Sequence, residues 1–463
     1  MENKIKKNKE YIVDIIDYGM DGEGIAKIDN FTIFIPNAMK NEKVKIVIVK
    51  VLSSHAYGKV IEILEKSPYR IESDCTTYKR CGGCDLRHID YEETLNIKQN
   101  MVQNLVNKTL NNKIEVNKTL NNKIEVNKTI GMGNPYHYRN KAQFPVGLNK
   151  QNEKVIGVFA KRTHEIIEIK DCFIQNTISQ QIAFAIQKFI IEKDISVYNE
   201  ENNEGLLRHI VIKVGLYTHE IMCILVINGK KIPYENELIE MLVKTYNVKT
   251  IIKNINTKNT NVILGHENIT IHGDGYIYDT LGDYTFKISP MSFYQVNPTQ
   301  AEVLYNTAIE MANLTKEDIL FDLYCGIGTI GIFASPYVKK VYGIEIVEQA
   351  IEDAKENAKI NNIENIEFYA GDAPKIFSNL MEKKQIYPDA IIVDPPRKGL
   401  DNNTINNILA VEPKKLVYIS CNPATMVRDM KMLSEKYEIG EIQPVDMFPF
   451  TSNVECVSVL KLK

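Results

Sequence analysis

The chain has 463 residues, of which 44% are hydrophobic and 25% charged, and its formal net charge is -3. This length and balance predict several globular domains and exclude disorder on the scale of a domain. The slight acidity gives no general attraction to nucleic acid, so a nucleic-acid site would have to be a local basic patch. Because the sequence has neither a signal-peptide core nor ~18 consecutive apolar residues, we expect a cytoplasmic protein without a membrane span.

The first predicted unit covers residues 1–66. Short runs such as FTIFIP and KVKIVIVKV alternate apolar and polar residues, and turn sequences such as GMDGEG separate them. Closely spaced short strands predict a small β-barrel of the OB type. Many such barrels bind RNA, but a purely structural barrel is the alternative, because a fold alone does not establish a function.

A cysteine-rich segment opens the second unit, residues 67–280. Cys75, Cys81 and Cys84 have the spacing C-x5-C-x2-C, with two glycines between the last two, and Cys172 is a distant candidate for a fourth ligand. Structural disulfides are not expected in the cytoplasm. Four thiolates suit zinc or an iron–sulfur cluster. The three-plus-one arrangement favours a [4Fe-4S] cluster, and zinc is the alternative.

The rest of this unit predicts an α+β central domain. A helical pattern follows the cysteines, and the decapeptide NKTLNNKIEV then occurs twice, at residues 107–116 and 117–126. Ten residues are too short for a solenoid repeat, so we interpret residues 107–130 as a loop insertion. Strand-like runs continue to about residue 280, and one helix near residues 178–191 interrupts them.

The third predicted unit covers residues 281–463. Short apolar runs such as ILFDLY, KVYGIEI and KLVYISCNP alternate with helical stretches. This alternation predicts a doubly wound α/β domain with a mainly parallel sheet. The last two runs have no helix between them and predict an antiparallel hairpin at one edge. The chain as a whole is therefore predicted to be multidomain.

Glycines after the first strand of this domain predict a cofactor site. Gly326, Gly328 and Gly331 satisfy G-x-G-x-x-G, and Glu345 ends the next strand, a pattern that fits NAD as well as S-adenosylmethionine. Asp372 and Asp394 follow the third and fourth strands. A carboxylate there suits a cationic sulfonium and would repel a pyrophosphate, so S-adenosylmethionine is favoured over NAD.

Two residues further along the chain fit methylation at a pyrimidine carbon. Cys421 directly follows a buried strand, at the sheet edge where ligands bind. A thiolate that adds to carbon 6 of uracil activates carbon 5, and a base must then remove the carbon 5 proton. Glu455 starts the last strand and is the candidate base. An inert buried thiol and a surface carboxylate are the alternatives for these two residues.

As an ordered set, the motifs resemble those of the bacterial RNA uracil-5-methyltransferases of the RumA/TrmA family. The similarity is greatest to the 23S ribosomal RNA branch, which carries an N-terminal TRAM domain. It covers almost the whole chain outside the repeat and rests on DYGMDGEGIAK, CGGC, YRNKAQFPV, SPMSFYQVN, DLYCGIGTIG, DPPRKGL, SCNP and SNVE. It implies a TRAM barrel of the OB type, an α+β domain with the cysteine cluster, and a Rossmann-like class I methyltransferase domain.

The resemblance also implies roles for single residues. It makes Cys421 the nucleophile and Glu455 the base in methylation of carbon 5 of a uracil. It implies contacts to S-adenosylmethionine from Gln295, Tyr324, Glu345 and Asp394. It implies a [4Fe-4S] cluster on Cys75, Cys81, Cys84 and Cys172. Thr329 departs from the transfer-RNA branch, which carries Asn there.

The expected partner is RNA, with 23S ribosomal RNA as the substrate and a monomeric enzyme. Candidate contacts to flanking nucleotides are Tyr138, Arg139, Lys141 and Arg208, with ordinary sheet residues as the equally weighted alternative. The competing functions are the same reaction on transfer RNA, cytosine-5 methylation, an RNA-binding cluster protein with an inactive methyltransferase fold, and an NAD oxidoreductase.

Overall fold

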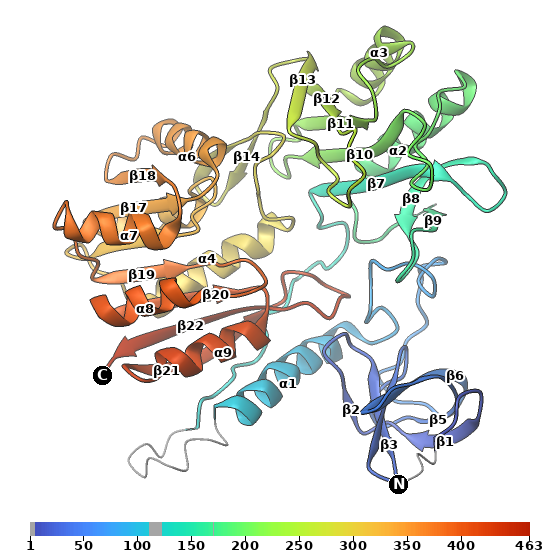
Figure 1. The fold of residues 1–463 in the computed structure, drawn as a ribbon, viewed down its shortest axis with the longest axis horizontal. Helices are drawn as coiled ribbons and strands as arrows, with labels where there is room; N and C mark the ends of the chain where they lie inside the picture. The colour runs from blue at the N-terminus through green and yellow to red at the C-terminus, as the bar shows by residue number, and fades with distance from the viewer. Residues whose placement is uncertain (1–4, 111–122, 170) are drawn as a thin grey trace.

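The computed structural model describes residues 5–110, 123–169 and 171–463, and Figure 1 shows three main parts. The N-terminal sheet (blue) lies at the lower right, the central sheet (green) at the upper right, and the C-terminal α/β part (orange to red) at the left. Among the described residues no helix is long and apolar enough to cross a membrane.

The N-terminal part is a six-stranded sheet with the order β1-β5-β6-β4-β3-β2. Val44, Ile46 and Ile48 on β5 are fully buried and alternate with partly exposed residues, which is the period of a strand with one face on a core. The strands are β1 (Glu10–Asp14), β2 (Asp17–Tyr18), β3 (Gly24–Ile28), β4 (Phe31–Ile35), β5 (Lys43–Val51) and β6 (His55–Glu65).

The central sheet has seven strands in the order β13-β12-β11-β10-β7-β8-β9. Every residue of β10 and β11 is buried, because helices cover one face and the C-terminal core covers the other. The elements are β7 (Lys141–Leu148), β8 (Lys154–Phe159), β9 (Ile166–Glu168), α2 (Thr177–Glu192), β10 (Leu207–Val214), β11 (Ile221–Ile227), α3 (Glu235–Tyr246), β12 (Thr250–Ile255) and β13 (Glu267–His272).

Helix α3 was not expected from the sequence, which predicted a single helix here. Its N-cap is Tyr234, which has a left-handed φ of 56° and no side-chain capping bond. The usual start signal of a Ser, Thr, Asp or Asn cap is therefore missing.

The C-terminal sheet has the order β18-β17-β16-β19-β20-β22-β21. Its first five strands are parallel and the last two form an antiparallel hairpin, which confirms the predicted topology. The elements are β14 (Ile277–Leu281), β15 (Tyr284–Ile288), α4 (Pro298–Ala312), β16 (Ile319–Leu323), α5 (Thr329–Ala334), η2 (Ser335–Tyr337), β17 (Lys340–Glu345), α6 (Glu348–Ile360), β18 (Ile366–Ala370), α7 (Ala373–Glu382), β19 (Ala390–Val393), α8 (Asn402–Val411), β20 (Lys415–Ser420), α9 (Pro423–Leu433), β21 (Tyr437–Val445) and β22 (Glu455–Leu462).

Helices cover both faces of this sheet. Buried residues of α4, α5 and α6 form one core, and those of α7, α8 and α9 form the other. Helix α1 (Tyr91–Thr109) also belongs to the second core, through Val102 and Val106, and lies beside α9 (Figure 1). An early segment of the chain thus completes the last domain.

The ends of the predicted insertion, residues 107–130, are ordered structure. Helix α1 continues to Thr109, and Val126 and Ile130 form bridges to Ile442 and Val445 on β21. The described ends therefore extend a helix and pair beside a strand, which corrects the loop interpretation for them. Residues 111–122, which hold most of the repeat, lie outside the described residues.

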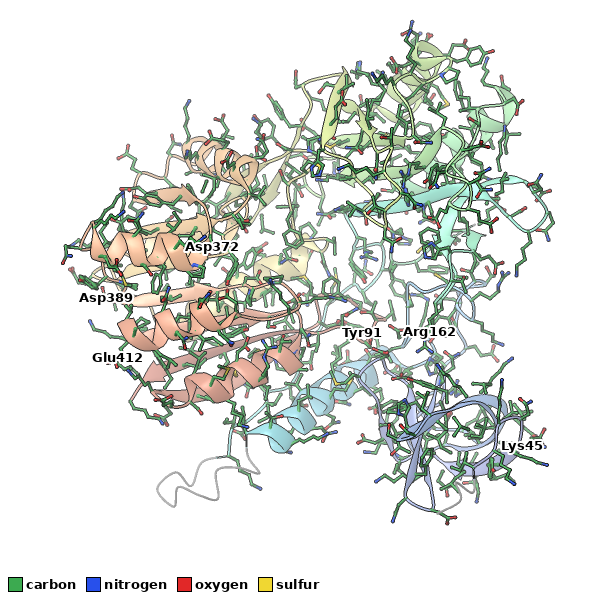
Figure 2. All side chains as sticks on the ribbon, in the orientation of Figure 1. Lys45, Tyr91, Arg162, Asp372, Asp389 and Glu412 are labelled. Carbon is green, nitrogen blue, oxygen red and sulfur yellow. The ribbon has the colours of Figure 1, made fainter. Side chains whose placement is uncertain are left out.

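The three parts meet at one junction, where Figure 2 labels Tyr91 and Arg162. The Arg162 guanidinium lies 5.6 Å from the centre of the Tyr57 ring on β6, so the central part contacts the N-terminal sheet. The Tyr91 hydroxyl donates to the Asp446 carboxylate over 2.9 Å, which joins α1 to the final hairpin. The carboxyl edge of the C-terminal sheet faces this junction.

Candidate active site

The carboxyl edge of the C-terminal sheet collects most of the predicted site residues. Five of them lie at or just past the end of a parallel strand: Tyr324 follows β16, Asp394 follows β19 and Cys421 follows β20. Glu345 ends β17, and Asp372 lies two residues past β18. Parallel strands end at one edge, so the five residues lie along it. Glu455 reaches the same edge because β22 runs antiparallel and begins there, with its neighbour Cys456 opposite Ser420.

The turn after β16 has the backbone of a ligand-binding loop. Gly326 and Gly328 have φ values of 54° and 83°, and Tyr324, which has a side chain, has a φ of 70°. A left-handed backbone at such a residue costs about 1–3 kcal/mol and is typical of functional sites. The Glu345 carboxylate accepts hydrogen bonds from the N–H groups of Gly326 at 3.2 Å and Val347 at 3.0 Å. The carboxylate is thereby held at the mouth of the glycine turn.

The surroundings of Glu345 fit a nucleoside. Ile346 and Val347 follow it directly and are 67% and 51% exposed, which is high for large apolar residues at the edge of a sheet. Two exposed apolar side chains beside a carboxylate match the face of an adenine next to ribose hydroxyls. The residues present therefore fit S-adenosylmethionine.

Two aromatic residues of the site were missed from the sequence. Phe293, two residues before Gln295, is 65% exposed, although the side chain is large and apolar. Tyr305 on α4 is buried, and its hydroxyl lies 3.4 Å from the Thr329 hydroxyl. Burial, followed by the charge of Asp394, raises the pKa of Tyr305, while bonds to Thr329 and Gln295 oppose the shift. The aromatic residue type inside the SPMSFYQVN motif, two positions before Gln295, was the available signal for Phe293.

Cys421 is a half-buried thiol on the turn into α9. Asn422 caps this helix, and its side-chain N–H donates to the Arg397 carbonyl over 2.9 Å, which ties the turn to the loop after β19. Burial raises the pKa of Cys421 to about 11, and the charges of Glu455 and Asp394 add to this, while Arg397 opposes it. The thiol therefore lies close to both carboxyl groups and to one guanidinium.

The two carboxyl groups share this buried environment. Burial, followed by the charge of Asp394, raises the pKa of Glu455 well above its usual range. Burial raises the pKa of Asp394 to about 6. Two neighbouring carboxylates in a site of this kind do not ionise independently. Glu455 therefore keeps its proton to a higher pH than an ordinary carboxyl group does.

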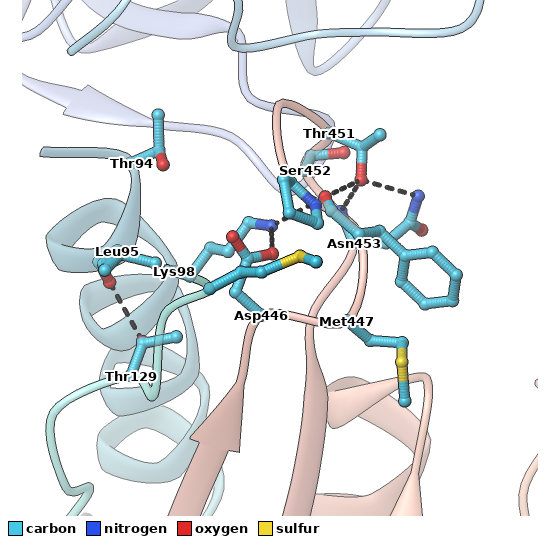
Figure 3. Close-up of polar contacts among 12 residues, drawn as sticks. Thr94, Leu95, Lys98, Thr129, Asp446, Met447, Thr451, Ser452 and Asn453 are labelled. Atoms are coloured by element: carbon cyan, nitrogen blue, oxygen red, sulfur yellow. Dashed lines mark hydrogen bonds and ion pairs between the residues drawn. The ribbon is translucent and has the colours of Figure 1, made fainter. Parts of the chain in front are cut away.

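Residues 446–454 form the loop between β21 and β22, which we call the catalytic loop because it leads into Glu455, the predicted base. Lys98 of α1 forms an ion pair with Asp446, both side chains being fully buried, and donates to the Phe448 carbonyl at 3.1 Å (Figure 3). Removal of one partner of such a pair costs about 3–5 kcal/mol. Lys98 lies on the apolar face of its helix, with Met101 and Val102. A lysine at such a position was the signal in the sequence that its side chain is buried and needs a charged partner.

The cysteine segment holds the other side of the catalytic loop. The N–H groups of Asp85 and Leu86 both donate to the Phe450 carbonyl over 2.9 Å. The Arg87 guanidinium lies 4.5 Å from the centre of the Phe450 ring. Phe450 itself has a φ of 65°, an unfavourable value for an aromatic residue. The catalytic loop is thus fixed from α1 and from the cysteine segment together.

The four predicted cluster ligands line a single cavity of about 490 Å³: Cys75, Cys81, Cys84 and Cys172. Arg87, Arg139 and Lys141 line it as well, and Arg87 Nη1 and Arg139 Nε are buried without hydrogen-bond partners. Over the described ranges, however, no group of three or more His, Cys, Asp or Glu side chains is arranged to hold a metal ion. The thiols surround an open space instead of converging on one point, as the ~2.3 Å bonds of tetrahedral zinc require.

The predicted RNA contacts are wrong for two residues. Tyr138 is 3% exposed and donates to the Pro449 carbonyl, and Arg208 is 4% exposed and donates to the carbonyls of Asn256 and Lys258. Both side chains serve the interior of the protein. Lys141 is partly buried in the cysteine cavity, where burial lowers its pKa. The aromatic and basic residue types had pointed to RNA, but strand position determines which side chains are exposed.

Comparison with known proteins gives a consistent result. A family model described as tRNA (uracil-5-)-methyltransferase matches residues 102–463, and a TRAM domain model matches residues 4–61. An uncharacterized RNA methyltransferase of Clostridium acetobutylicum is 47% identical over 459 residues, 99% of this chain and 98% of that protein. Another, of Staphylococcus aureus, is 44% identical over 464 residues, 99% of each chain.

A solved structure is similar over nearly the whole length. It is the Pyrococcus abyssi tRNA (uracil-54, C5)-methyltransferase in complex with S-adenosyl-L-homocysteine, with a TM-score of 0.75 and 26% identity, covering 97% of this chain and 100% of that one. These matches confirm the predicted family and exclude the NAD oxidoreductase. The chain is an S-adenosylmethionine-dependent RNA (uracil-5-)-methyltransferase and belongs to the tRNA (uracil-5-)-methyltransferase family, with a TRAM domain at its N-terminus.

Proposed function

We propose that the enzyme methylates carbon 5 of a uracil in 23S ribosomal RNA through a covalent intermediate on Cys421. The observation that carries the mechanism is the grouping of Cys421, Glu455 and Asp394 at the carboxyl edge of the sheet. The charges of both carboxyl groups add to the raised pKa of Cys421, and the charge of Asp394 adds to that of Glu455. A nucleophile and a base that face one buried space are what addition to a pyrimidine requires.

The reaction starts at the Cys421 sulfur. The thiolate forms a bond to carbon 6 of the uracil, and the electron pair of the double bond between carbons 5 and 6 moves to carbon 5 and to the oxygen of the neighbouring carbon 4 carbonyl. Burial and the two carboxyl charges favour the thiol, whereas Arg397 and the N-terminus of α9, directly after Cys421, act in favour of the thiolate. Gln295, Tyr324, Glu345 and Asp394 would hold S-adenosylmethionine, which would supply an electrophilic methyl group to carbon 5 and leave as S-adenosyl-L-homocysteine when its methyl–sulfur bond breaks.

Glu455 completes the cycle. It takes the proton from carbon 5, the double bond forms again, and the bond between carbon 6 and sulfur breaks. Cys421 leaves as a thiolate, so the electrons balance, and Glu455 passes its proton to water. The sulfonium charge of bound S-adenosylmethionine would lower the pKa of Asp394 and Glu455 and so favour the ionised form of Glu455 before methyl transfer.

The choice of RNA rests on the resemblance to the ribosomal branch, in which the TRAM domain and the cysteines occur together. Transfer RNA is the second candidate, because the similar Pyrococcus abyssi enzyme acts on it and covers 97% of this chain. A match of that extent includes most of the N-terminal part, so the TRAM domain alone does not favour ribosomal RNA.

Methylation mapping tests the substrate. We expect 5-methyluridine at one or more 23S positions in cells with the gene and its loss there in cells without it, while transfer RNA is unchanged. Loss of 5-methyluridine from transfer RNA alone would show that transfer RNA is the substrate and 23S ribosomal RNA is not. Unchanged methylation in both pools would reject the function.

The cavity of the four thiols is proposed to hold a [4Fe-4S] cluster. Its thiols surround an open space, and the Gly83 N–H donates to Cys81 Sγ over 3.2 Å, a bond that stabilises a thiolate. The orphaned guanidinium donors of Arg87 and Arg139 suit an anionic group.

Anaerobically purified protein is expected to contain about four iron and four sulfide per chain, as the cluster formula requires. Cys84→Ser should lower both contents, whereas Cys223→Ser, which alters a buried thiol on β11, should change neither. One equivalent of zinc in colourless protein would instead support the zinc alternative.

A further inference from the structure

A second cavity lies beside Cys421, on the side that faces the N-terminal sheet. We call it the vestibule; its volume is about 190 Å³. Cys421 lines it, but the cofactor-side residues Gln295, Glu345 and Asp394 do not. Whatever fills the vestibule therefore adjoins the reacting base without occupying the place of the cofactor.

Five segments that are distant in the sequence build the vestibule. Met20 and Asp21 come from the turn between β2 and β3 of the TRAM domain, and Met101, Val102 and Leu105 come from α1. The remaining wall is formed by the loop after β19, the turn at Cys421 and the catalytic loop, with Arg397, Asn422, Ser452 and Asn453.

The TRAM turn is held in this position. Gly22 has a φ of 78°, and a Cβ there would lie 2.7 Å from Leu86 Cδ2 and 3.6 Å from Ser452 Cβ. The turn is closed by the Gly19 N–H, which donates to the Glu23 carbonyl over 2.7 Å. Only glycine allows the turn to lie this close to the cysteine segment and the catalytic loop. The TRAM domain thus presents Met20 and Asp21 to the active site.

The chemistry of the walls matches a nucleobase. Methionine, valine and leucine side chains offer an apolar surface, and thioethers make favourable contacts with aromatic rings. Arg397, which is exposed and donates to Asn453 Oδ1 over 3.0 Å, supplies donors, and Asp21 supplies acceptors. A phosphate would be repelled by Asp21, whereas the edge of a base carries donors and acceptors together.

We propose that the vestibule binds the base of a nucleotide that flanks the target uracil, with Met20 of the TRAM domain as one wall. The proposal rests on the proposed function, because it needs an RNA substrate attached to Cys421. It makes the TRAM domain a direct part of substrate selection next to the reacting base. An unstacked flanking base held there also helps to keep the target uracil out of its stack.

The test compares two variants on two RNAs. Met20 is 45% exposed, so Met20→Ala should fold normally, and Ile61→Ala removes a 49% exposed side chain from the same domain as the matched control. Neither Met20 nor Ile61 lies among the cofactor-side residues. The RNAs are a substrate fragment and the same fragment with an abasic nucleotide beside the target.

Met20→Ala is expected to raise the KM for the intact fragment about 2–10-fold, as loss of a thioether–aromatic contact predicts, with unchanged binding of S-adenosyl-L-homocysteine. The abasic fragment should raise the wild-type KM, and Met20→Ala should add little to that rise. Ile61→Ala should match the wild type on both RNAs.

Three results would overturn the proposal: an unchanged KM in Met20→Ala, an equal rise in Ile61→Ala, or independent effects of Met20→Ala and of the abasic substitution beside the target. If wild-type protein methylates no RNA, the proposed function fails instead, so the two failures are distinguishable.

Discussion

Replacement of Cys421 with alanine is expected to abolish both RNA methylation and the covalent protein–RNA adduct. In the proposed mechanism the sulfur forms the bond that activates carbon 5, and no other group of the described site offers a comparable nucleophile. Loss of a nucleophile typically lowers kcat by on the order of 10⁴–10⁶-fold. Methyl transfer from labelled S-adenosylmethionine and denaturing gels of enzyme with a 5-fluorouridine RNA measure the two effects.

Cys223→Ala is the matched control for this variant. Cys223 is buried on β11 of the central sheet, and burial raises the pKa of its thiol to about 12, so it is an inert core residue. The control should form the adduct at the wild-type rate. A Cys421→Ala enzyme that still forms an adduct would show that another residue is the nucleophile.

Replacement of Glu455 with glutamine is expected to have the opposite effect on the adduct. Addition of Cys421 and methyl transfer need no base at carbon 5, but release of the enzyme does. The methylated adduct should therefore accumulate, with release about 10²–10⁴-fold slower, as general-base catalysis predicts. A chase with unlabelled RNA and denaturing gels measures the lifetime of the adduct.

The pH dependence of enzyme release from the adduct distinguishes a base role of Glu455 from a structural role. The raised pKa of Glu455 means that its charged form is lost as the pH falls through that value. Release of wild-type enzyme should slow on the acid side, whereas Glu455→Gln should be slow at every pH. Glu441→Gln, at an exposed position of β21, should behave as wild type. Free turnover of Glu455→Gln would contradict the assignment.

The sheet edge was predictable because strand ends can be read locally. Cys421 and Asp394 each follow a short apolar run, and parallel strands bring such positions together without knowledge of any contact. The antiparallel hairpin that returns Glu455 was predictable for the same reason, since no helix separates the last two runs.

The contacts that fix the catalytic loop were not predictable. Lys98 and Asp446 are 348 residues apart, and nothing in either local pattern names the other as its partner. Met20 of the TRAM turn reaches the vestibule only through the relative placement of whole domains. Tyr138 and Arg208 failed as RNA contacts because their exposure depends on how later segments cover the sheet. Pairings between distant segments, rather than local propensity, set these features.

The ion pair of Lys98 and Asp446 also determines when the active site forms during synthesis. Helix α1 leaves the ribosome early, and its lysine has no buried carboxylate to meet until the last hairpin has been made. Contacts at such sequence separation form late and slowly. The loop before Glu455 is therefore set only when nearly every residue of the chain is present. In the proposed mechanism, a nascent or truncated chain would carry Cys421 without a positioned base, so the ability to release methylated RNA would mark completion of the fold.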